Sequence, residues 1–540
     1  MAGLVLLAPL PARAQTVRIC VIQGPGAIAP MLGSRVSTSG VVTADFQSSL
    51  GGFFMQEPGC DADAATSDGI FVSTVGRPVP VTVGNRVTVS GRVADTAGLT
   101  TVVAESVSDG GPYAGSMEAV RLSPPADTVA AAAYFESFEG MLVSLAPSRV
   151  IAATDHTGQS FVMPDSSGVT RLYRGDVDGR KLALAAPGNW LMLSQGDRVS
   201  DVTGVLREIS GLFEVDVPPA RSVTVERSGA APPDAGAASS ATLTVATFNL
   251  QGLFDATDDP GRDDEVPTAE QYAAALDRRA NSIARYLGRP DVIGVQEAEK
   301  IEVLQDLAAL PALIATGYRA VLVEGTDPRG LDVGLLYDSA RLGLRSAEAR
   351  PACSAVRPPS GPVVSCALPA GGSGFQLFTR PPLVVRLEAL DNRERLTVVV
   401  NHFQDPSGDP AADEQVRVAQ ADAVRALVDE LKTAEPSVPV IVLGDLNAFE
   451  DSATLQHLTS GGRLVNPVAR GSERTYTHAT RGLCEVIDHV LVDTALVPRV
   501  AEARVLHVSV DFGDPGPGAP ATASPRASDH DPVRLVLTRP

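Results

Sequence analysis

The sequence predicts a multidomain protein in which an all-β N-terminal half precedes an α/β layered domain. First, 540 residues are too many for one ordinary core, so we expect two or three domains. Second, short runs that alternate apolar and polar residues fill the chain up to about residue 226. Third, longer segments with helical spacing alternate with apolar strands after residue 242, which is typical of an α/β domain.

The N-terminal half contains a weak internal repeat. The segment Gly84–Val93 resembles Gly196–Val205, and glycine, asparagine and aspartate punctuate the runs at short intervals. We therefore expect two small barrels or sandwiches in tandem, at 16–118 and 119–226. Residues 227–241 lack periodicity and large apolar side chains, which predicts a flexible linker before the last domain at 242–538.

The last domain shows clear strands and helices. Apolar runs predict buried strands, and apolar side chains recur near every 3.6 residues in two longer segments. We expect strands at Leu243–Phe248, Asp291–Gln296 and Val438–Gly444, and helices at Ala269–Leu287 and Glu414–Leu431.

Residues 1–14 have the features of a signal peptide. Their apolar run is too short to span a bilayer, and Ala12-Arg13-Ala14 fits a small-x-small cleavage site. We therefore expect a secreted or periplasmic protein; a frayed apolar tail is the alternative. No other segment reaches membrane-spanning length, so we expect no membrane span.

The five cysteines fit an oxidising compartment. Cys353 and Cys366 bracket a loop that a disulfide closes easily, and Cys20 and Cys60 are placed to pair within the N-terminal half. Cys484 is then unpaired, and its apolar neighbours predict burial. No cysteine or histidine cluster suggests zinc.

The charge of −20 bears on the class of function. A protein that coats nucleic acid is normally basic, so the charge argues against passive DNA binding. It is only mild evidence against a nuclease, because divalent cations can screen an acidic site. Aromatic residues make up 4%, which argues against extensive base-stacking platforms.

Polar side chains collect where the apolar strands of the last domain end. Reacting groups gather at strand ends in open α/β architectures. The clusters are Asn249; Gln296 and Glu297; Asn401 and His402; Asp445 and Asn447; and Asp488 with Asp529 and His530. Each is a weak signal alone, and together they predict a catalytic site.

These clusters carry a resemblance to a known family. The chain from about residue 243 to 537 resembles the endonuclease/exonuclease/phosphatase superfamily, the fold of pancreatic-type deoxyribonuclease. The resemblance implies a four-layer α/β sandwich of two packed sheets flanked by helices. The matching stretches are Ala246–Asp255, Val292–Glu297, Val400–Phe403, Gly444–Ala448, Val486–Val492 and Ser528–Val533.

Other segments narrow the resemblance. Asp327–Gly334 and Arg380–Leu383 are similar to bacterial extracellular nucleases. Gly52–Gln56 and Ser67–Val72 are similar to the OB-like domain that often precedes this catalytic domain. The resemblance therefore implies OB-like N-terminal domains.

The resemblance implies a divalent cation, Mg²⁺ or Mn²⁺, held by oxygen ligands. Glu297 and Asp529 are the expected metal ligands, and Asn249 is expected to bind the metal or the substrate phosphate. Ca²⁺ is a further possibility at an acidic loop of the N-terminal half, although an ordinary solvated loop is the simpler interpretation. That loop contains Asp61, Asp63 and Asp68.

Five residues are expected to act in catalysis. His530 prepares water or holds phosphate as an imidazolium, and Asp488 orients it. Asp445 aligns or deprotonates the water, and Asn447, two residues on and hence on the same side, donates to the phosphate. The resemblance implies that His402 protonates the leaving oxygen or donates a hydrogen bond to it.

Three further residues have two interpretations each. Arg329 grips a flanking phosphate and Asp332 orients His402, or the two belong to a loop salt bridge. Tyr476 contacts substrate or packs inside the domain. His478 and His489 receive no role, and His489 is expected to face away from Asp488.

We therefore expect a monomeric, secreted, metal-dependent nuclease that hydrolyses DNA in preference to RNA by direct attack of water. A phosphatase or phospholipid phosphodiesterase on the same scaffold is the first alternative, since loops decide the substrate. A non-catalytic binding protein is the second. The N-terminal half is acidic too, and a structural or sorting role is favoured there over nucleic-acid binding.

Overall fold

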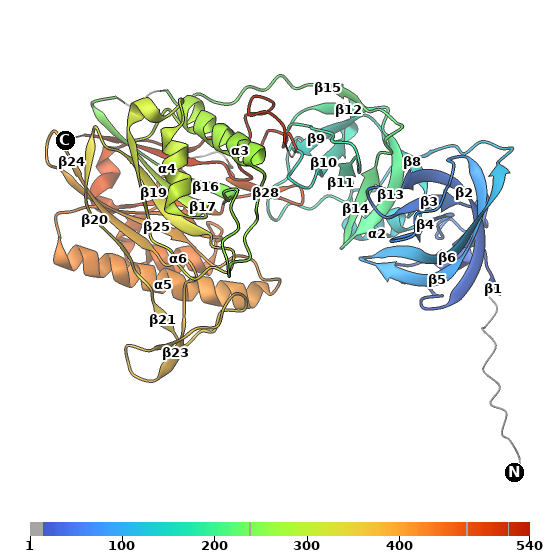
Figure 1. Ribbon diagram of the computed structural model, residues 1–540, viewed down its shortest axis with the longest axis horizontal. Helices are drawn as coiled ribbons and strands as arrows, with labels where there is room; N and C mark the ends of the chain where they lie inside the picture. The colour runs from blue at the N-terminus through green and yellow to red at the C-terminus, as the bar shows by residue number, and fades with distance from the viewer. Residues whose placement is uncertain (1–14, 237–238, 471–473, 517, 540) are drawn as a thin grey trace, which may run out of the picture. The chain divides into compact units, whose positions relative to one another are not determined.

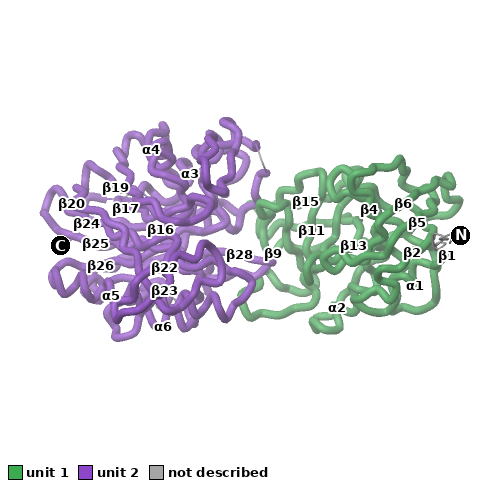
Figure 2. The backbone as a smooth tube through the Cα atoms, turned by 60° about the horizontal axis from the view of Figure 1, so that its bottom comes forward, with its two compact units in different colours: residues 1–229 green, residues 230–540 purple. Residues whose placement is uncertain are grey.

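The computed structural model describes residues 15–236, 239–470, 474–516 and 518–539. They fall into two compact units, 1–229 and 230–540 (Figures 1 and 2). The unit boundary lies inside the segment 227–241 expected to be a linker. The expected signal peptide, 1–14, lies outside the described residues. Within them, no helix is long and apolar enough to cross a bilayer.

The first unit begins with a five-stranded barrel. Its strands follow the order β2-β3-β4-β6-β5, and β5 pairs with β2 to close the circuit. The β4–β6 pair is parallel and the other pairs of the circuit are antiparallel. The elements are β1 (Gln15–Thr16), α1 (Ile19–Gln23), β2 (Arg35–Phe46), β3 (Gly52–Gln56), β4 (Gly69–Ser73), β5 (Asn85–Thr96) and β6 (Leu99–Pro112).

The second barrel repeats this circuit with two interrupted strands. The consecutive strands β8 and β9 together take the place of β2, and β12 with β13 takes the place of β5. The parallel pair is β11–β14. The elements are β7 (Val120–Arg121), α2 (Thr128–Glu136), β8 (Leu142–Ser144), β9 (Ser148–Ala152), β10 (Ser160–Pro164), η1 (Asp165–Ser167), β11 (Leu182–Ala185), β12 (Arg198–Ser200), β13 (Thr203–Ile209), β14 (Leu212–Asp216) and β15 (Thr224–Glu226).

The internal sequence repeat therefore has a structural counterpart. Its two copies lie on β5 and on β12–β13, the matching strands of the two barrels. In the second copy, Asp201 adopts a left-handed φ of 57° and breaks the strand in two. The strands of the first barrel end at Pro112, and the sheet of the second begins at Val120.

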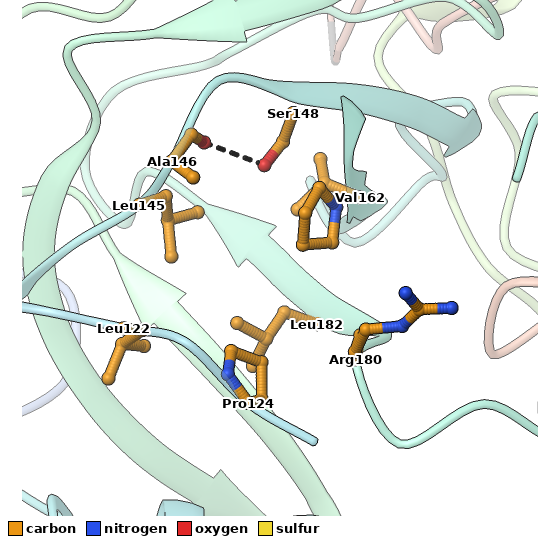
Figure 3. A pocket seen from close by; sticks show the side chains of 9 residues that line it. Leu122, Pro124, Leu145, Ala146, Ser148, Val162, Arg180 and Leu182 are labelled. Atoms are coloured by element: carbon orange, nitrogen blue, oxygen red, sulfur yellow. Dashed lines mark hydrogen bonds between the residues drawn. The ribbon is translucent and has the colours of Figure 1, made fainter. Parts of the chain in front are cut away.

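The second barrel encloses a small apolar cavity, shown in Figure 3. Leucine, valine and proline side chains line it, and the Ser148 hydroxyl is satisfied by the Ala146 carbonyl at 2.8 Å. The cavity volume is about 10 Å³, which holds at most one water.

The disulfide predictions are confirmed. Cys20 pairs with Cys60 in the first barrel, and Cys353 pairs with Cys366 in the second unit. Cys484 is buried and takes part in neither disulfide, as expected.

The second unit contains two six-stranded sheets. The first has the order β18-β19-β17-β16-β32-β31 and the second β20-β24-β25-β26-β30-β27. The strands are β16 (Thr242–Leu253), β17 (Val292–Ala298), β18 (Tyr318–Leu322), β19 (Asp332–Asp338), β31 (Val500–Val505) and β32 (Val533–Thr538), then β20 (Leu342–Ala349), β24 (Leu383–Ala389), β25 (Arg395–His402), β26 (Val440–Asp445), β27 (Leu464–Val465) and β30 (Asp488–Asp493).

Shorter elements decorate this pair of sheets. A three-stranded sheet carries the Cys353–Cys366 disulfide, and a two-stranded hairpin precedes β30. They are β21 (Cys353–Ser354), β22 (Ser365–Ala367), β23 (Ser373–Gln376), β28 (His478–Thr480) and β29 (Leu483–Glu485). The helices are α3 (Ala269–Asn281), η2 (Ser282–Tyr286), α4 (Ile301–Ala309), η3 (Ile314–Thr316), α5 (Pro410–Ala434), α6 (Ala453–Thr459), η4 (Ser460–Gly462), η5 (Val468–Arg470) and η6 (Thr494–Arg499).

The layers of the second unit follow from its buried clusters. One cluster joins side chains of both sheets, such as Val245 and Leu443, and forms the central core. A second packs α3 and α4 onto the first sheet, and a third packs α5 and α6 onto the other (Figure 1). The sheets approach closely at Gly294, where an added Cβ would lie 2.2 Å from Leu443 Cδ1. These four layers agree with the expected α/β sandwich.

Helix boundaries differ from the expectation in one place. Thr268 and Gln271 form a capping box at the start of α3, but the α-helix ends at Asn281 and a π-helical turn continues to Tyr286. The apolar spacing from 269 to 287 does not distinguish the two kinds of turn. The second expected helix is present and longer, since α5 runs from Pro410 to Ala434.

Candidate active site

The polar clusters predicted at the strand ends converge in the second unit. β16 and β17 run parallel in the first sheet, and β25 and β26 run parallel in the second, so their carboxyl ends lie at the same edge. β30 and β32 run antiparallel to them and contribute residues at or before their starts. The Asn249 amide donates to Glu297 of its own sheet and to Asp445 of the second sheet, and the latter hydrogen bond links the two sheets there.

A buried imidazole–carboxylate pair lies at this edge. His530 Nδ1 is 2.7 Å from Asp488 Oδ2, and both residues are buried. Burial alone lowers the pKa of His530, but the carboxylates of Asp488 and Asp445 raise it well above the ordinary value. The second ring nitrogen, Nε2, is 3.8 Å from Asp445 Oδ2, which leaves it available to a ligand. The imidazolium form is therefore favoured, with one N–H directed into the site.

Asp445 and Asn447 follow the end of β26. Asp445 Oδ1 accepts the backbone N–H of Asn447 at 2.9 Å, and Asp445 Oδ2 accepts the Asn249 amide at 3.0 Å. Asn447 adopts a left-handed φ of 46°, a conformation that asparagine tolerates better than most residues. Its amide donates to Asp405 Oδ1 at 3.2 Å. The turn thus places a carboxylate and an amide side by side.

His402, the last residue of β25, is buried beside Asp445. Its Nε2 lies 3.1 Å from Asp405 Oδ1 and 3.6 Å from Asp445 Oδ2. Arg380 is fully buried and donates to Asp405 at 2.8 Å. Although burial opposes ionisation, Arg380 and His402 hold the pKa of Asp405 well below its usual value. Asp405 is therefore an anion between the Arg380 guanidinium and the His402 imidazole.

Glu297 owes its direction to a β-bulge. The pairing of β17 with β19 shifts between Gln296 and Ala298, and Glu297 in the bulge has a left-handed φ of 62°. Its Oε2 accepts the backbone N–H of Gly252 at 2.7 Å, and its Oε1 accepts the Asn249 amide at 3.0 Å. A regular strand would turn this side chain elsewhere.

Asn249 is fully buried and holds two carboxylates together. Its amide nitrogen donates to Glu297 and Asp445, while its amide oxygen accepts the backbone N–H of Gln251 at 2.9 Å. In this orientation Asn249 positions the expected metal ligand Glu297 and the catalytic Asp445, and its own oxygen is already occupied.

Asp529 shares its surroundings with two imidazoles. A carboxylate oxygen of Asp529 and ring nitrogens of His478 and His530 lie within 4.8 Å of one another. Burial raises the pKa of Asp529, but His530, His478 and Arg526 outweigh it and lower the pKa below the usual value. Asp529 is thus ionised and has the geometry of a metal ligand. Glu297 lies outside this group and is linked to the site through Asn249.

The donor set fits a hard divalent cation. The atoms of Asp445, Asp488 and His530 form a second group within 4.8 Å of one another, in which the two carboxylates are the available donors while His530 is an imidazolium. Asp488 Oδ1 is buried without a hydrogen-bond partner, an arrangement that a cation or a bound water relieves. Carboxylate oxygens from several strand ends are the ligands that Mg²⁺, Mn²⁺ and Ca²⁺ prefer.

The expected link between Asp332 and His402 is absent. Asp332 Oδ1 instead accepts the backbone N–H of Gly325 at 2.8 Å, and His402 pairs with Asp405. Arg329 lies with its Nη2 3.7 Å from Asp405 Oδ2 and is 43% exposed. Its guanidinium therefore lies at the rim, close to the carboxylate that contacts His402.

The proposed substrate contact of Tyr476 is not supported. Tyr476 is only 4% exposed, its hydroxyl donates to Asp511 at 2.8 Å, and its ring stacks on His507. With the hydroxyl and the ring face both occupied, Tyr476 is a packing residue.

The acidic loop of the first unit gives no sign of a Ca²⁺ site. Asp61 and Asp63 accept backbone N–H groups two residues further along, which is the bonding of ordinary Asx turns. Among the described residues, the groups with metal-ligand geometry include none of Asp61, Asp63 and Asp68.

Three site residues escaped the sequence reasoning. His478 lies with its ring centroid 4.9 Å from that of His530, and Glu485 holds its Nδ1 at 3.0 Å. Asp405 was detectable, because it follows His402 by three residues in a polar turn. Arg380 belongs to a segment that carried the family resemblance, yet nothing in its spacing indicates contact with Asp405.

A comparison with protein-family models finds one match in the second unit. Residues 244–502 match the model described as Endonuclease/Exonuclease/phosphatase family. No curated protein matches the chain.

Several solved structures show limited similarity to the second half of the chain. They include an endonuclease/exonuclease/phosphatase from Bacteroides vulgatus, with 18% identity, a TM-score of 0.38, and coverage of 55% of this chain and 99% of that one. The human Nocturnin catalytic domain has 16% identity, a TM-score of 0.36, and coverage of 55% and 94%. A mannosyl-6-phosphatase from Bacteroides thetaiotaomicron has 18% identity, a TM-score of 0.37, and coverage of 55% and 99%.

The family match covers every predicted site residue except Asp529 and His530, which follow its end. The strand ends that it includes supply Asn249, Glu297, His402, Asp445 and Asp488. Over residues 244–502 the chain is thus similar to the endonuclease/exonuclease/phosphatase family, whose members are hydrolases of phosphoester bonds.

Proposed function

We propose that the second unit is a divalent-metal-dependent phosphodiesterase that hydrolyses nucleic acid, with DNA preferred over RNA. The observation that carries the proposal is the buried Asp488–His530 pair, whose free Nε2 faces the carboxylates of Asp445 and Asp529. An imidazolium among carboxylates suits a reaction in which charge builds on phosphoryl oxygens and a proton must reach a leaving group.

Glu297 and Asp529 are the residues that would hold the metal, with Asn249 setting the position of Glu297. A bound Mg²⁺ or Mn²⁺ supplies charge neutralisation at the phosphoryl group. The protein residues do the remaining work. Asn447 presents an amide to the phosphate oxygens, and Arg329 at the rim offers a cation to a flanking phosphate.

The proton transfers follow from the positions of the side chains. The oxygen of a water forms the new bond to phosphorus, and its proton passes to Asp445. The bond from phosphorus to the leaving oxygen breaks, and that oxygen takes a proton from the imidazolium of His530. His402, 3.6 Å from Asp445, holds that carboxylate in place. No covalent intermediate is needed.

We also propose the setting of the enzyme. Two disulfides suit a secreted or periplasmic protein, and the segment 1–14 would deliver it there. The strand order of each N-terminal barrel, with its single parallel pair, supports an OB-like assignment. We propose a monomer, in which these barrels have a structural or sorting role.

Plasmid nicking tests the activity. The full chain is incubated with supercoiled plasmid, a phospholipid and a phosphomonoester, each with Mg²⁺ and with EDTA. We expect nicking that EDTA abolishes. His530→Ala and Asp488→Asn should each lower the rate by roughly 100-fold or more, the usual contribution of a positioned acid or base.

His457→Ala is the matched control, because His457 is exposed on α6 and pairs with Asp422 instead of a site residue. It should nick plasmid at the wild-type rate. Full activity in His530→Ala would contradict the proposed chemistry. Hydrolysis of only the phospholipid or the phosphomonoester would favour the alternative substrates, and no hydrolysis at all would favour a binding protein.

A further inference from the structure

Three glutamates of the first unit meet where its two barrels join. Glu136 is the last residue of α2, Glu139 follows three residues later, and Glu208 lies on β13. One carboxylate oxygen of each lies within 4.8 Å of one from each of the others. We call Glu136, Glu139 and Glu208 the joint cluster.

The first barrel closes over the joint cluster. An added Cβ at Gly98, in the turn between β5 and β6, would lie 2.7 Å from the carboxyl carbon of Glu208. The carbonyl of Ala97 in the same turn accepts the backbone N–H of Ser210. An apolar contact between the barrels adjoins the cluster and includes Leu99 and Leu142. The three carboxylates are therefore covered by protein from both barrels.

Glu139 carries the clearest sign of a missing ligand. The residue is fully buried, and its Oε1 accepts the backbone N–H of Thr100 at 2.9 Å and the Gln23 amide at 3.4 Å. Its Oε2 is buried and has no hydrogen-bond partner. A buried carboxylate oxygen left unpaired is strongly unfavourable, so this atom needs a proton or a cation.

No cation of the described chain meets this need. None of the joint-cluster glutamates forms an ion pair with a lysine, arginine or histidine, and Asp95 adds further negative charge beside Glu136 and Glu208. The carboxyl end of α2 adds the negative pole of the helix dipole. Burial raises the pKa of Glu139 to about 8 and that of Glu136 to about 7, with neighbouring carboxylates contributing to both.

We propose that the joint cluster binds a hard divalent cation, Ca²⁺ by class, and that this cation holds the two barrels together. All three protein donors are carboxylate oxygens, which suit Ca²⁺ and exclude soft metals. Glutamates from separate elements also tolerate the larger and less regular coordination of Ca²⁺ better than the strict octahedron of Mg²⁺. This site is separate from the active site and independent of the proposed function.

Trp190 makes the site testable in the full chain. It is the only tryptophan and lies in the first unit, so its fluorescence follows the unfolding of that unit alone. Protein stripped with EDTA is heated at pH 7.5 without metal, with 5 mM Ca²⁺, and with 5 mM Mg²⁺. We expect Ca²⁺ to raise the unfolding midpoint by roughly 5 °C or more and Mg²⁺ to raise it less.

Variants distinguish binding at the joint cluster from a general salt effect. Glu208→Gln and Glu136→Gln remove one ligand charge at half-buried positions and should abolish the Ca²⁺ shift. Glu226→Gln is the matched control, because Glu226 is exposed on β15, and it should keep the shift. Glu139→Gln, if it folds, should unfold at the same temperature with and without Ca²⁺.

Three outcomes would overturn the proposal. One is a wild-type midpoint that Ca²⁺ does not move. Another is a Ca²⁺-induced shift of the midpoint in both Glu208→Gln and Glu136→Gln that equals the wild-type shift. The third is a midpoint that falls between pH 6 and 9 by the same amount with and without Ca²⁺, because the carboxylates would then be stabilised by protons.

Discussion

His489 should make the second unit sensitive to acid. The ring is fully buried on β30; its Nε2 lies 2.7 Å from the carbonyl oxygen of Ala448, and its Nδ1 lies 3.4 Å from the Asn466 amide nitrogen. The neutral ring satisfies both contacts, with Nε2–H donating and Nδ1 accepting. Burial lowers the pKa of His489 to about 4 from its ordinary 6.5.

Proton linkage gives the direction and the size of the change in unfolding free energy that His489 causes at low pH. The unfolded chain binds a proton at His489 below about pH 6.5, whereas the folded chain does so only near pH 4. The neutral ring therefore contributes stability that is complete above pH 6.5 and is lost as the pH falls through 4. A gap of this size corresponds to about 3 kcal/mol of unfolding free energy.

His489→Gln tests this value, because the glutamine amide can still donate to Ala448 but does not titrate. Hydrogen–deuterium exchange of peptides from β26 and β30 reports the unfolding free energy of this unit. Between pH 7 and pH 4 we expect wild-type protein to lose about 3 kcal/mol more than the variant does. An equal loss in both proteins, or an NMR titration of His489 near pH 6.5, would refute the reasoning.

Three further predictions concern other parts of the second unit. Asp332→Asn should be more stable than wild type at pH 8 but not at pH 3.5, as measured by urea denaturation. Burial raises the pKa of Asp332 to about 7, so the folded wild-type chain holds a proton there that the unfolded chain loses near pH 3.8. The stability that this proton gives wild type is therefore lost as the pH rises from 3.8 through 7. His478→Ala should slow plasmid nicking at least tenfold, while an unchanged rate would make His478 a packing residue. Cys353→Ser with Cys366→Ser should raise hydrogen exchange in β21–β23, since the disulfide contributes about 3 kcal/mol by loop closure, and should leave nicking intact.

The strand-end clusters were predictable because each apolar run and the polar residues that follow it are neighbours in the sequence. A run such as Val440–Leu443 predicts a strand, and polar residues directly after it must lie at the sheet edge. The same logic gave Glu297 near the end of β17 and His402 at the end of β25. Which strand ends face one another depends on how the two sheets pack. Periodicity does not predict that packing, and the family resemblance indicated it instead.

Contacts between segments far apart in the chain were not predictable in this way. His478 reaches His530 through an isolated β-bridge, and Tyr476, two residues earlier, is buried against His507. Tyrosine and histidine occur both in active sites and in protein cores, so the residue type alone does not predict which role a given side chain has. Asp332 was paired with the wrong partner although the actual contacts are local, since Gly325 precedes Asp332 by seven residues and Asp405 follows His402 by three.

The backbone at the site shows why its geometry lies beyond residue patterns. Glu297 and Asn447 both hold left-handed φ values, which disfavour a side chain by about 1 kcal/mol or more. Each is stabilised by a hydrogen bond that a regular strand could not make, from Gly252 to Glu297 and from Asn447 to Asp445. The strain is retained because it turns the Glu297 carboxylate toward Asn249 and the Asn447 amide toward Asp405. A strand that followed its own period would point the Glu297 carboxylate away from Asn249, and the amide that donates to Asp445 of the other sheet would then lose the carboxylate that holds it.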